Sequence, residues 1–214
     1  KTEGERQRDA GQTHSARTTL RNLWQNVAYR EGVLTQMFYV AAQIMTWTFI
    51  IQYADNLGIN KATAQLYNIA AMVLCLSSRF LSTFLMKYFN AKKLLSVFAA
   101  GAGLCTLGAI LIVGKAGLIC LVCVSFFMSL MFPTIYGISL EKVEPQDTNL
   151  GAAFLVMAIV GGALMPPLQG AIIDRGTLLG HPAVNVSFVL PLICFAIVAL
   201  YGVRANRRKV SLGE

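Results

Sequence analysis

The segment "SFFMSLMFPTIYGISLEKVEPQD", residues 125–147, places a proline near the middle of an apolar run. Pro133 has no backbone N–H, so inside a soluble helix it would remove a hydrogen bond and cost about 3 kcal/mol. Thr134, Tyr136 and Ser139 follow it closely. A membrane helix tolerates such a break where neighbouring helices, water or a hydroxyl satisfy the freed backbone groups. We therefore expect a bent membrane helix that lines a hydrated cavity; a kink that serves only packing is the alternative.

The composition extends this expectation to the whole chain. Of 214 residues, 56% are hydrophobic and only 13% are charged, whereas soluble domains carry about 25% charged residues. Apolar runs near the ~20 residues that cross a bilayer occur six times. They lie near 33–54, 63–86, 94–113, 117–140, 150–173 and 184–203. We predict an all-α membrane protein with a six-helix transmembrane bundle at 33–204, a cytoplasmic linker at 1–32 and a cytoplasmic tail at 205–214.

The basic residues are distributed unequally between the two sides that this topology defines. Fifteen lie on the side of the two ends, namely Lys1, Arg6, Arg8, Arg17, Arg21, Arg30, Arg79, Lys87, Lys92, Lys93, Lys142, Arg204, Arg207, Arg208 and Lys209. Only Lys61, Lys115 and Arg175 lie on the other side. Because Lys and Arg accumulate in cytoplasmic loops, we expect both ends in the cytoplasm and the bundle in the inner or plasma membrane, with lipids as partners. This topology explains the net charge of +8, so we expect no nucleic acid partner.

The segment that precedes the first span has two parts. Residues 1–19 are polar, which predicts a flexible linker, and the following "TTLRNLWQNVAYREG" is amphipathic. Leu20, Leu23, Trp24 and Val27 are expected on one face of a helix that lies along the cytoplasmic membrane surface. A cytoplasmic linker that leads into six spans suggests the second half of a longer polytopic protein.

The first span carries a polar stripe. Gln36, Tyr39, Gln43 and either Thr46 or Trp47 recur at intervals of three and four residues, so they share one helix face. An amide in hydrocarbon without a partner costs several kcal/mol, so this face should contact protein or water. Aromatic faces stack on the C–H patches of a pyranose, and amides bond its hydroxyls. The stripe favours a sugar-binding surface; a simple hydrogen bond to a neighbouring helix is the alternative for Gln43.

Two other spans carry candidate functional residues. In the fifth span, Gly161-Gly162 precede Pro166-Pro167, and interrupted helices are typical of transporter sites and their moving parts. We expect these four residues to bend or gate the helix. Asn68 of the second span has two equal interpretations, helix packing and substrate binding.

Charged residues mark the internal end of the second span. Arg79 and Lys87 either form a cytoplasmic charge latch that opens and closes between conformations or act only as topology determinants.

The chain lacks the motifs of common enzyme classes. It contains no HExxH, GxSxG or Walker sequence, and both histidines, His14 and His181, fall in predicted loops. Cys120 and Cys123 form a CxxC on an apolar helix, where thiols act as small packing groups. We therefore expect no catalytic residue, no metal site and no cofactor.

Four segments carry a family resemblance: "FYVAAQIMTWTFIIQYA" (38–54), "SSRFLSTFLMKYF" (77–89), "SFFMSLMFPTIYGISL" (125–140) and "VMAIVGGALMPPLQGAIID" (156–174). Together they resemble the carboxyl-terminal half of the L-fucose permease-type sugar:proton symporters of the major facilitator superfamily. The resemblance covers about residues 30–204. It implies a twelve-helix carrier in which this chain supplies the seventh to twelfth helices and an amino-terminal six-helix half is its partner.

The resemblance also implies a function. It predicts uptake of a small sugar (fucose, glucose, galactose or a related monosaccharide) by proton symport with alternating access. The proton-binding acids would lie in the partner half. Residues expected to face the sugar are Tyr39, Gln43, Trp47, Asn68, Phe132 and Tyr136. Phe132 stands where we align a tyrosine in the fucose permease, so one possible sugar contact is missing, and Ser78 stands where relatives commonly have glycine. A membrane sugar sensor or interaction protein that does not transport is the alternative.

Overall fold

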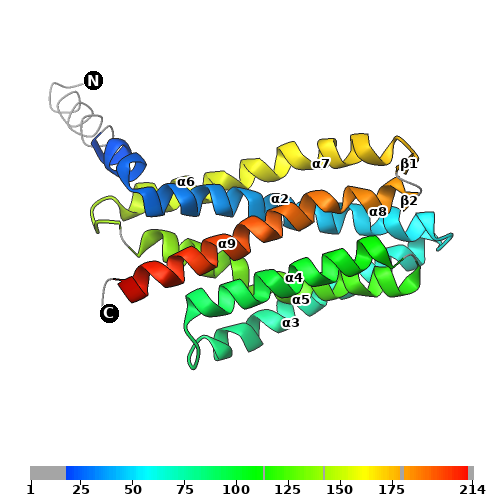
Figure 1. Ribbon diagram of the computed structural model, residues 1–214, viewed down its shortest axis with the longest axis horizontal. Helices are drawn as coiled ribbons and strands as arrows, with labels where there is room; N and C mark the ends of the chain where they lie inside the picture. Colours follow the sequence, from blue (N-terminus) through cyan, green and yellow to red (C-terminus); the bar gives the residue numbers. More distant parts are fainter. Residues whose placement is uncertain (1–17, 113, 142, 179–180, 212–214) are drawn as a thin grey trace, which may run out of the picture.

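The computed structural model describes residues 18–112, 114–141, 143–178 and 181–211, and nearly all of them are helical. Residues 1–17, most of the flexible linker expected at residues 1–19, lie outside the described residues. Six helical segments are long and apolar enough to cross a membrane, which confirms the predicted all-α membrane fold. Figure 1 shows them side by side along the long axis of the molecule.

The first four spans are single helices and the last two are interrupted. They are α2 (Val27–Asn56), α3 (Lys61–Leu85), α4 (Ala91–Leu111) and α5 (Lys115–Leu140). The fifth joins α6 (Thr148–Met157), the 3₁₀ turn η1 (Ala158–Val160) and α7 (Gly161–Ile173), and the sixth joins α8 (Ala183–Ser187) and α9 (Val189–Ser211). Between these two spans, β1 (Thr177–Leu178) pairs antiparallel with β2 (His181–Pro182).

Asparagine side chains set where three of the spans begin. The Oδ1 of Asn26 accepts hydrogen bonds from the backbone N–H groups of Ala28 (3.1 Å) and Tyr29 (3.3 Å). Asn60 and Asn90 likewise accept from the N–H groups two residues further on, at 3.2 Å and 3.0 Å. Each cap satisfies backbone donors that have no partner in the first turn. The cap at Asn26 starts α2 six residues before the predicted span, and α9 continues through most of the predicted tail.

The central helix of the bundle is α2. It packs on α5, α9 and α7, and Figure 1 shows it between α9 and the α6–α7 segment. The largest buried cluster joins α2, α4, α5 and α9 through side chains such as Tyr39, Met45, Leu95, Met128 and Phe195, each fully buried. This cluster holds the polar stripe of α2 against α5, the helix that contains Pro133.

Two spans leave most of their apolar surface uncovered. Only 28% of the most apolar stretch is buried within the chain for α3 and for the α6–α7 span, against 56% for α2 and for α5. Phe80, Leu66 and Leu164 are examples of large exposed side chains on these spans. Apolar faces of this kind are stable against lipid or against another helix bundle.

A short helix at residues 18–25 precedes α2 and contacts the α5–α6 connection. Leu23 is buried in a cluster with Tyr29 and Leu155, and the hydroxyl of Thr19 donates to the Asp147 carboxylate at 2.7 Å. Leu20, Trp24 and Val27 are exposed. The four apolar residues predicted on one face thus divide, because Leu23 packs against the bundle while the other three remain outside it. Residues 18–25 and the end of α9 lie at the same end of the bundle (Figure 1).

Candidate transport site

The polar stripe of α2 divides into a buried part and a half-buried part. Gln43 and Trp47 are both half-buried, whereas Tyr39 is fully buried. The indole N–H of Trp47 donates to the Ser125 hydroxyl at 3.2 Å, which fixes the ring against α5. The structure therefore leaves Gln43 and Trp47 partly accessible on one helix face, one turn apart.

Tyr39 contacts α5 on the turn that precedes Pro133. Its hydroxyl donates to the backbone carbonyl of Met128 at 2.9 Å, and its ring meets Phe132 edge-on with centroids 6.3 Å apart. Because Pro133 has no N–H, the helix cannot use its regular bond to the Ser129 carbonyl, which is the neighbour of the carbonyl that Tyr39 bonds. Tyr39 thus stabilises the backbone next to the break from a second helix.

The hydroxyls that follow Pro133 bond within their own helix. Thr134 donates to the carbonyl of Leu130 at 2.8 Å, and Ser139 donates to the carbonyl of Ile135 at 2.6 Å. Tyr136 is half-buried and packs on the cluster of Leu23, Tyr29 and Leu155. The structure therefore brings Tyr39 and Phe132 together and places Tyr136 in a different cluster.

A cluster of serines, not predicted from the sequence, lies between α3 and α5 one turn before Pro133. The hydroxyl of Ser78 on α3 bonds the Ser129 hydroxyl on α5 and also contacts the carbonyl of Phe126 (2.7 Å), while Ser82 lies 3.2 Å from Ser129. All three serines are buried. The spacing S-x₃-S, at 78 and 82 and again at 125 and 129, was the available signal, because such pairs share a helix face.

Asn68 lies on the inner face of α3. It is 7% exposed, and its Oδ1 has no hydrogen-bond partner among the described residues. Ala64 and Ala71, one turn away on either side, belong to a buried cluster that includes Ile50 and Leu121. The orphan acceptor leaves Asn68 with capacity for one more hydrogen bond.

The fifth span departs from α-helical geometry before its prolines. The 3₁₀ turn at Ala158–Val160 precedes Gly161 and Gly162, both buried. A Cβ at Gly161 would clash with the side chain of Met37, and one at Gly162 with Ile44. Both glycines thus allow close contact between α7 and α2, while Pro166 is half-buried and Pro167 is exposed.

A groove opens where α3 ends, α4 begins and α5 ends. It has a volume of ≈ 440 Å³ and is lined by Met86, Asn90, Ala91, Lys92, Pro133, Thr134, Gly137, Ile138 and Glu141. Inside it, the ammonium of Lys92 lies 2.6 Å from the carboxylate of Glu141. The exposed side chains of Arg79 and Lys87, predicted as a charge latch, make no ion pair with the described part of the chain.

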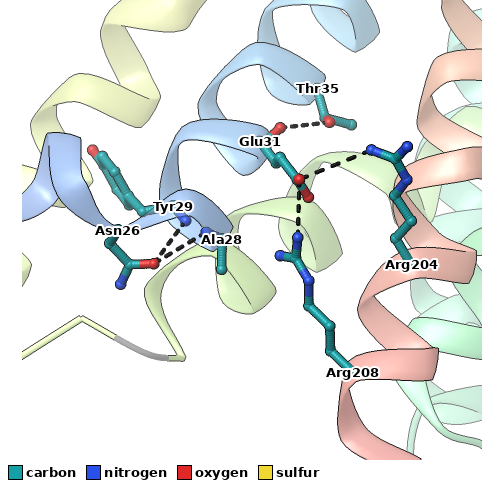
Figure 2. A network of polar contacts seen from close by, with 7 residues as sticks. All are labelled: Asn26, Ala28, Tyr29, Glu31, Thr35, Arg204 and Arg208. Carbon is teal, nitrogen blue, oxygen red and sulfur yellow. Dashed lines mark hydrogen bonds and ion pairs between the residues drawn. The ribbon is translucent and has the colours of Figure 1, made fainter. Parts of the chain in front are cut away.

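A second ion-pair group joins the beginning of α2 to the end of α9. Figure 2 shows the Glu31 carboxylate facing Arg208 at 2.9 Å and Arg204 at 3.9 Å. No local pattern in the sequence predicts this contact, because Arg204 and Arg208 lie 173 and 177 residues from Glu31 along the chain. The two ion-pair groups lie at the same end of the bundle.

These features define a class of protein before any comparison is made. Six apolar helical segments, a proline inside a span beside buried hydroxyls, and a half-buried amide and indole one turn apart are typical of a multi-pass membrane transporter.

Comparison with known proteins gives the family. The model of the Major Facilitator Superfamily matches residues 1–166, and the chain therefore belongs to this family. The chain is 59% identical over 197 residues to the L-fucose-proton symporter of Haemophilus influenzae, with 92% of this chain and 46% of that protein covered. It is 34% identical to the L-fucose-proton symporter of Escherichia coli, with 81% of this chain and 39% of that protein covered.

A solved structure confirms the fold. The crystal structure of FucP, a Major Facilitator Superfamily transporter in the outward conformation, superposes with a TM-score of 0.81 at 31% identity. The match covers 87% of this chain and 44% of FucP. The chain therefore spans less than half the length of each of these relatives. Its fold matches that of a little under half of the transporter FucP.

Proposed function

We propose that the intact protein takes up a small sugar together with protons by alternating access, and that this chain supplies its carboxyl-terminal half. The relatives named as L-fucose-proton symporters support the reaction. The observation in this chain that carries the proposal is the half-buried pair of Gln43 and Trp47 on one face of α2, with Trp47 bonded to Ser125 of α5.

The sugar would lie between this face and an absent six-helix half. The amide of Gln43 can donate to one sugar hydroxyl and accept from another, and the Trp47 ring offers an apolar face. Asn68 has an unused acceptor, and Phe132 adds a second aromatic ring next to Tyr39. Tyr136 takes part in sugar binding only if the α2–α5 contact rearranges, because here it packs on another cluster.

The moving parts of the cycle would be the interrupted helices. Pro133 and the segment from Gly161 to Pro167 supply the bends, and the ion pairs at one end of the bundle would form and break as the two halves rock. Arg79 and Lys87 would find acidic partners in the other half. The proton gradient drives uptake with about 2.3 kcal/mol per charge for each 100 mV.

The proposed orientation follows from the basic residues. Their excess at the end where α2 begins and α9 ends would place both ends of the chain in the cytoplasm. The bundle would then lie in the inner or plasma membrane, in contact with lipid through the uncovered faces of α3 and of the α6–α7 span.

Uptake by cells that express the intact gene tests this proposal. We expect labelled L-fucose to accumulate, and a protonophore to abolish the accumulation. Glucose and galactose are the next sugars to compare. Sugar binding to the purified protein without uptake would contradict transport and favour a membrane sugar sensor.

One substitution tests the site. Gln43→Ala removes a hydrogen bond to the sugar, worth about 0.5–1.5 kcal/mol, so the KM for uptake should rise about twofold to tenfold. Gln52→Ala is the matched control, since Gln52 lies on the same helix but is exposed near its end. An unchanged KM in the Gln43 variant would exclude this residue from the site.

A further inference from the structure

Gln36 is the most unusual polar residue of the bundle. Its side chain is 0% exposed, and neither Oε1 nor Nε2 has a hydrogen-bond partner within the described residues. At least nine in ten buried polar groups have a partner in protein or ordered water. An amide with both ends unpaired therefore requires a partner that the side chains around it do not provide.

The surroundings of Gln36 lead toward the Glu31 ion pairs. Gly32 lies one turn away on the same face of α2, and a Cβ at Gly32 would clash with the Ser139 hydroxyl and lie 3.2 Å from the Tyr201 hydroxyl. The two hydroxyls are 3.3 Å apart and buried. Glycine at position 32 thus lets α5 and α9 bring two hydroxyls against α2, one turn from the orphan amide.

The same polar series continues in both directions. Arg204 and Arg208 follow Tyr201 on one face of α9 and reach Glu31 at the outer end (Figure 2). In the other direction, Gln43 lies two turns beyond Gln36 on α2. Polar groups at one-turn spacing therefore run from the partly exposed ion pairs to Gln36, and Gln43 of the proposed sugar site lies two turns, about 10.8 Å, beyond it.

The spacing of this series fits water. Positions one helical turn apart are separated by about 5.4 Å, and a water with two hydrogen bonds of about 2.8 Å spans about the same distance. Water both donates and accepts, as the two ends of an amide require. A cation would need several more oxygen ligands, and the site is fully enclosed, which excludes a sugar.

We propose that Gln36 holds a buried water molecule, and that this water connects Ser139 and Tyr201 to the polar stripe of α2 as part of a proton path. The path would join the sugar site to the end of the bundle that carries Glu31. Each hydroxyl or water on the path accepts a proton on one side and gives up its own proton on the other, so one O–H bond forms for each that breaks. The Gln36 amide exchanges no proton and only holds the water. This inference rests on the proposed proton-coupled uptake.

Gln36→Leu in the intact carrier tests the proposal. Leucine removes the orphan amide at similar size, which in a merely dry site would be neutral or stabilising. We expect proton-driven accumulation to fall by on the order of tenfold, which corresponds to a barrier higher by about 1.4 kcal/mol. Sugar exchange without a proton gradient should be unchanged, because the sugar does not contact Gln36. Gln52→Leu is the control, and Gln36→Met replaces the leucine variant should that variant fail to fold.

The outcomes separate this proposal from the proposed function. Unchanged accumulation in Gln36→Leu, or an equal loss of exchange and accumulation, would overturn it. A structure of the intact carrier that resolves buried waters gives an independent test. We expect a water within hydrogen-bond reach of Gln36, and an empty site would overturn the proposal. If the wild type moves no sugar, proton symport fails and the proton path fails with it, and the water measurement then decides only whether Gln36 holds a water.

Discussion

The two ends of the bundle are held together by different chemistry. At the end where α2 stops, Asn185 donates to the Tyr53 hydroxyl and to the carbonyl of Ala109, both at 3.1 Å, and the Tyr53 hydroxyl lies 3.0 Å from the same carbonyl. Tyr53 and Asn185 are each 1% exposed. At the end where α2 starts, Glu31, Arg204 and Arg208 form ion pairs that water can reach.

This difference indicates which end separates more easily. Exposed ion pairs contribute about 0–1 kcal/mol each and weaken with salt. Separating the helices at the end held by Tyr53 and Asn185 would leave buried donors and acceptors without partners, at about 1–3 kcal/mol per group. The end with the ion pairs and the groove is therefore the one at which helices part at the lower cost.

The largest effect on the free energy of unfolding is expected at the end held by Tyr53 and Asn185. Asn185→Ala removes the donor to Tyr53 and Ala109 and leaves a small cavity, so the free energy of unfolding should fall by about 2 kcal/mol. Unfolding in detergent can be followed by alkylation of the buried thiols of Cys75 and Cys194. A change below the effect of the ion-pair variants would contradict the comparison of the two ends.

An intermediate effect is expected in the groove. Lys92 keeps only 11% of its side chain exposed, so Glu141→Gln leaves a poorly hydrated ammonium without its partner. We expect a loss of about 1 kcal/mol in the same alkylation assay. Restoring the pair in reversed order, with Lys92→Glu and Glu141→Lys together, should recover part of it; no recovery would exclude the ion pair as the cause.

The smallest effect is expected at Glu31. Its side chain is 26% exposed and the side chains of Arg204 and Arg208 are more exposed still, so Glu31→Gln should cost about 0.5 kcal/mol. The difference from wild type should disappear in high salt, whereas the effect of Asn185→Ala should persist. Equal salt dependence of the two variants would remove the distinction between the ends.

The spans could be predicted from the sequence because hydropathy acts locally. The predicted run at 117–140 became Lys115–Leu140, and the run at 63–86 became Lys61–Leu85. Pro133 lies inside α5, which runs as one helix from Lys115 to Leu140, so the bend expected at this residue stays a prediction. The starts of α3 and α4 also have a local cause, because Asn60 and Asn90 each cap the N–H group two residues further on.

The partners of polar side chains could not be predicted, because they depend on how distant helices align. Gln36 and Gln43 have the same side chain and share one stripe, yet one is fully buried and the other half-buried. Asn185 fell at the edge of a predicted loop and received no role, although it joins three helices.

The asparagine caps have a consequence for how the protein is made. Each cap needs only the amides two or three residues further along the chain. The starting point of α2, α3 and α4 can thus be fixed while the ribosome is still adding later residues, before any neighbouring helix exists to pack against. The depth of each span in the bilayer would then be set during synthesis, and not by later movement of the complete helices against one another.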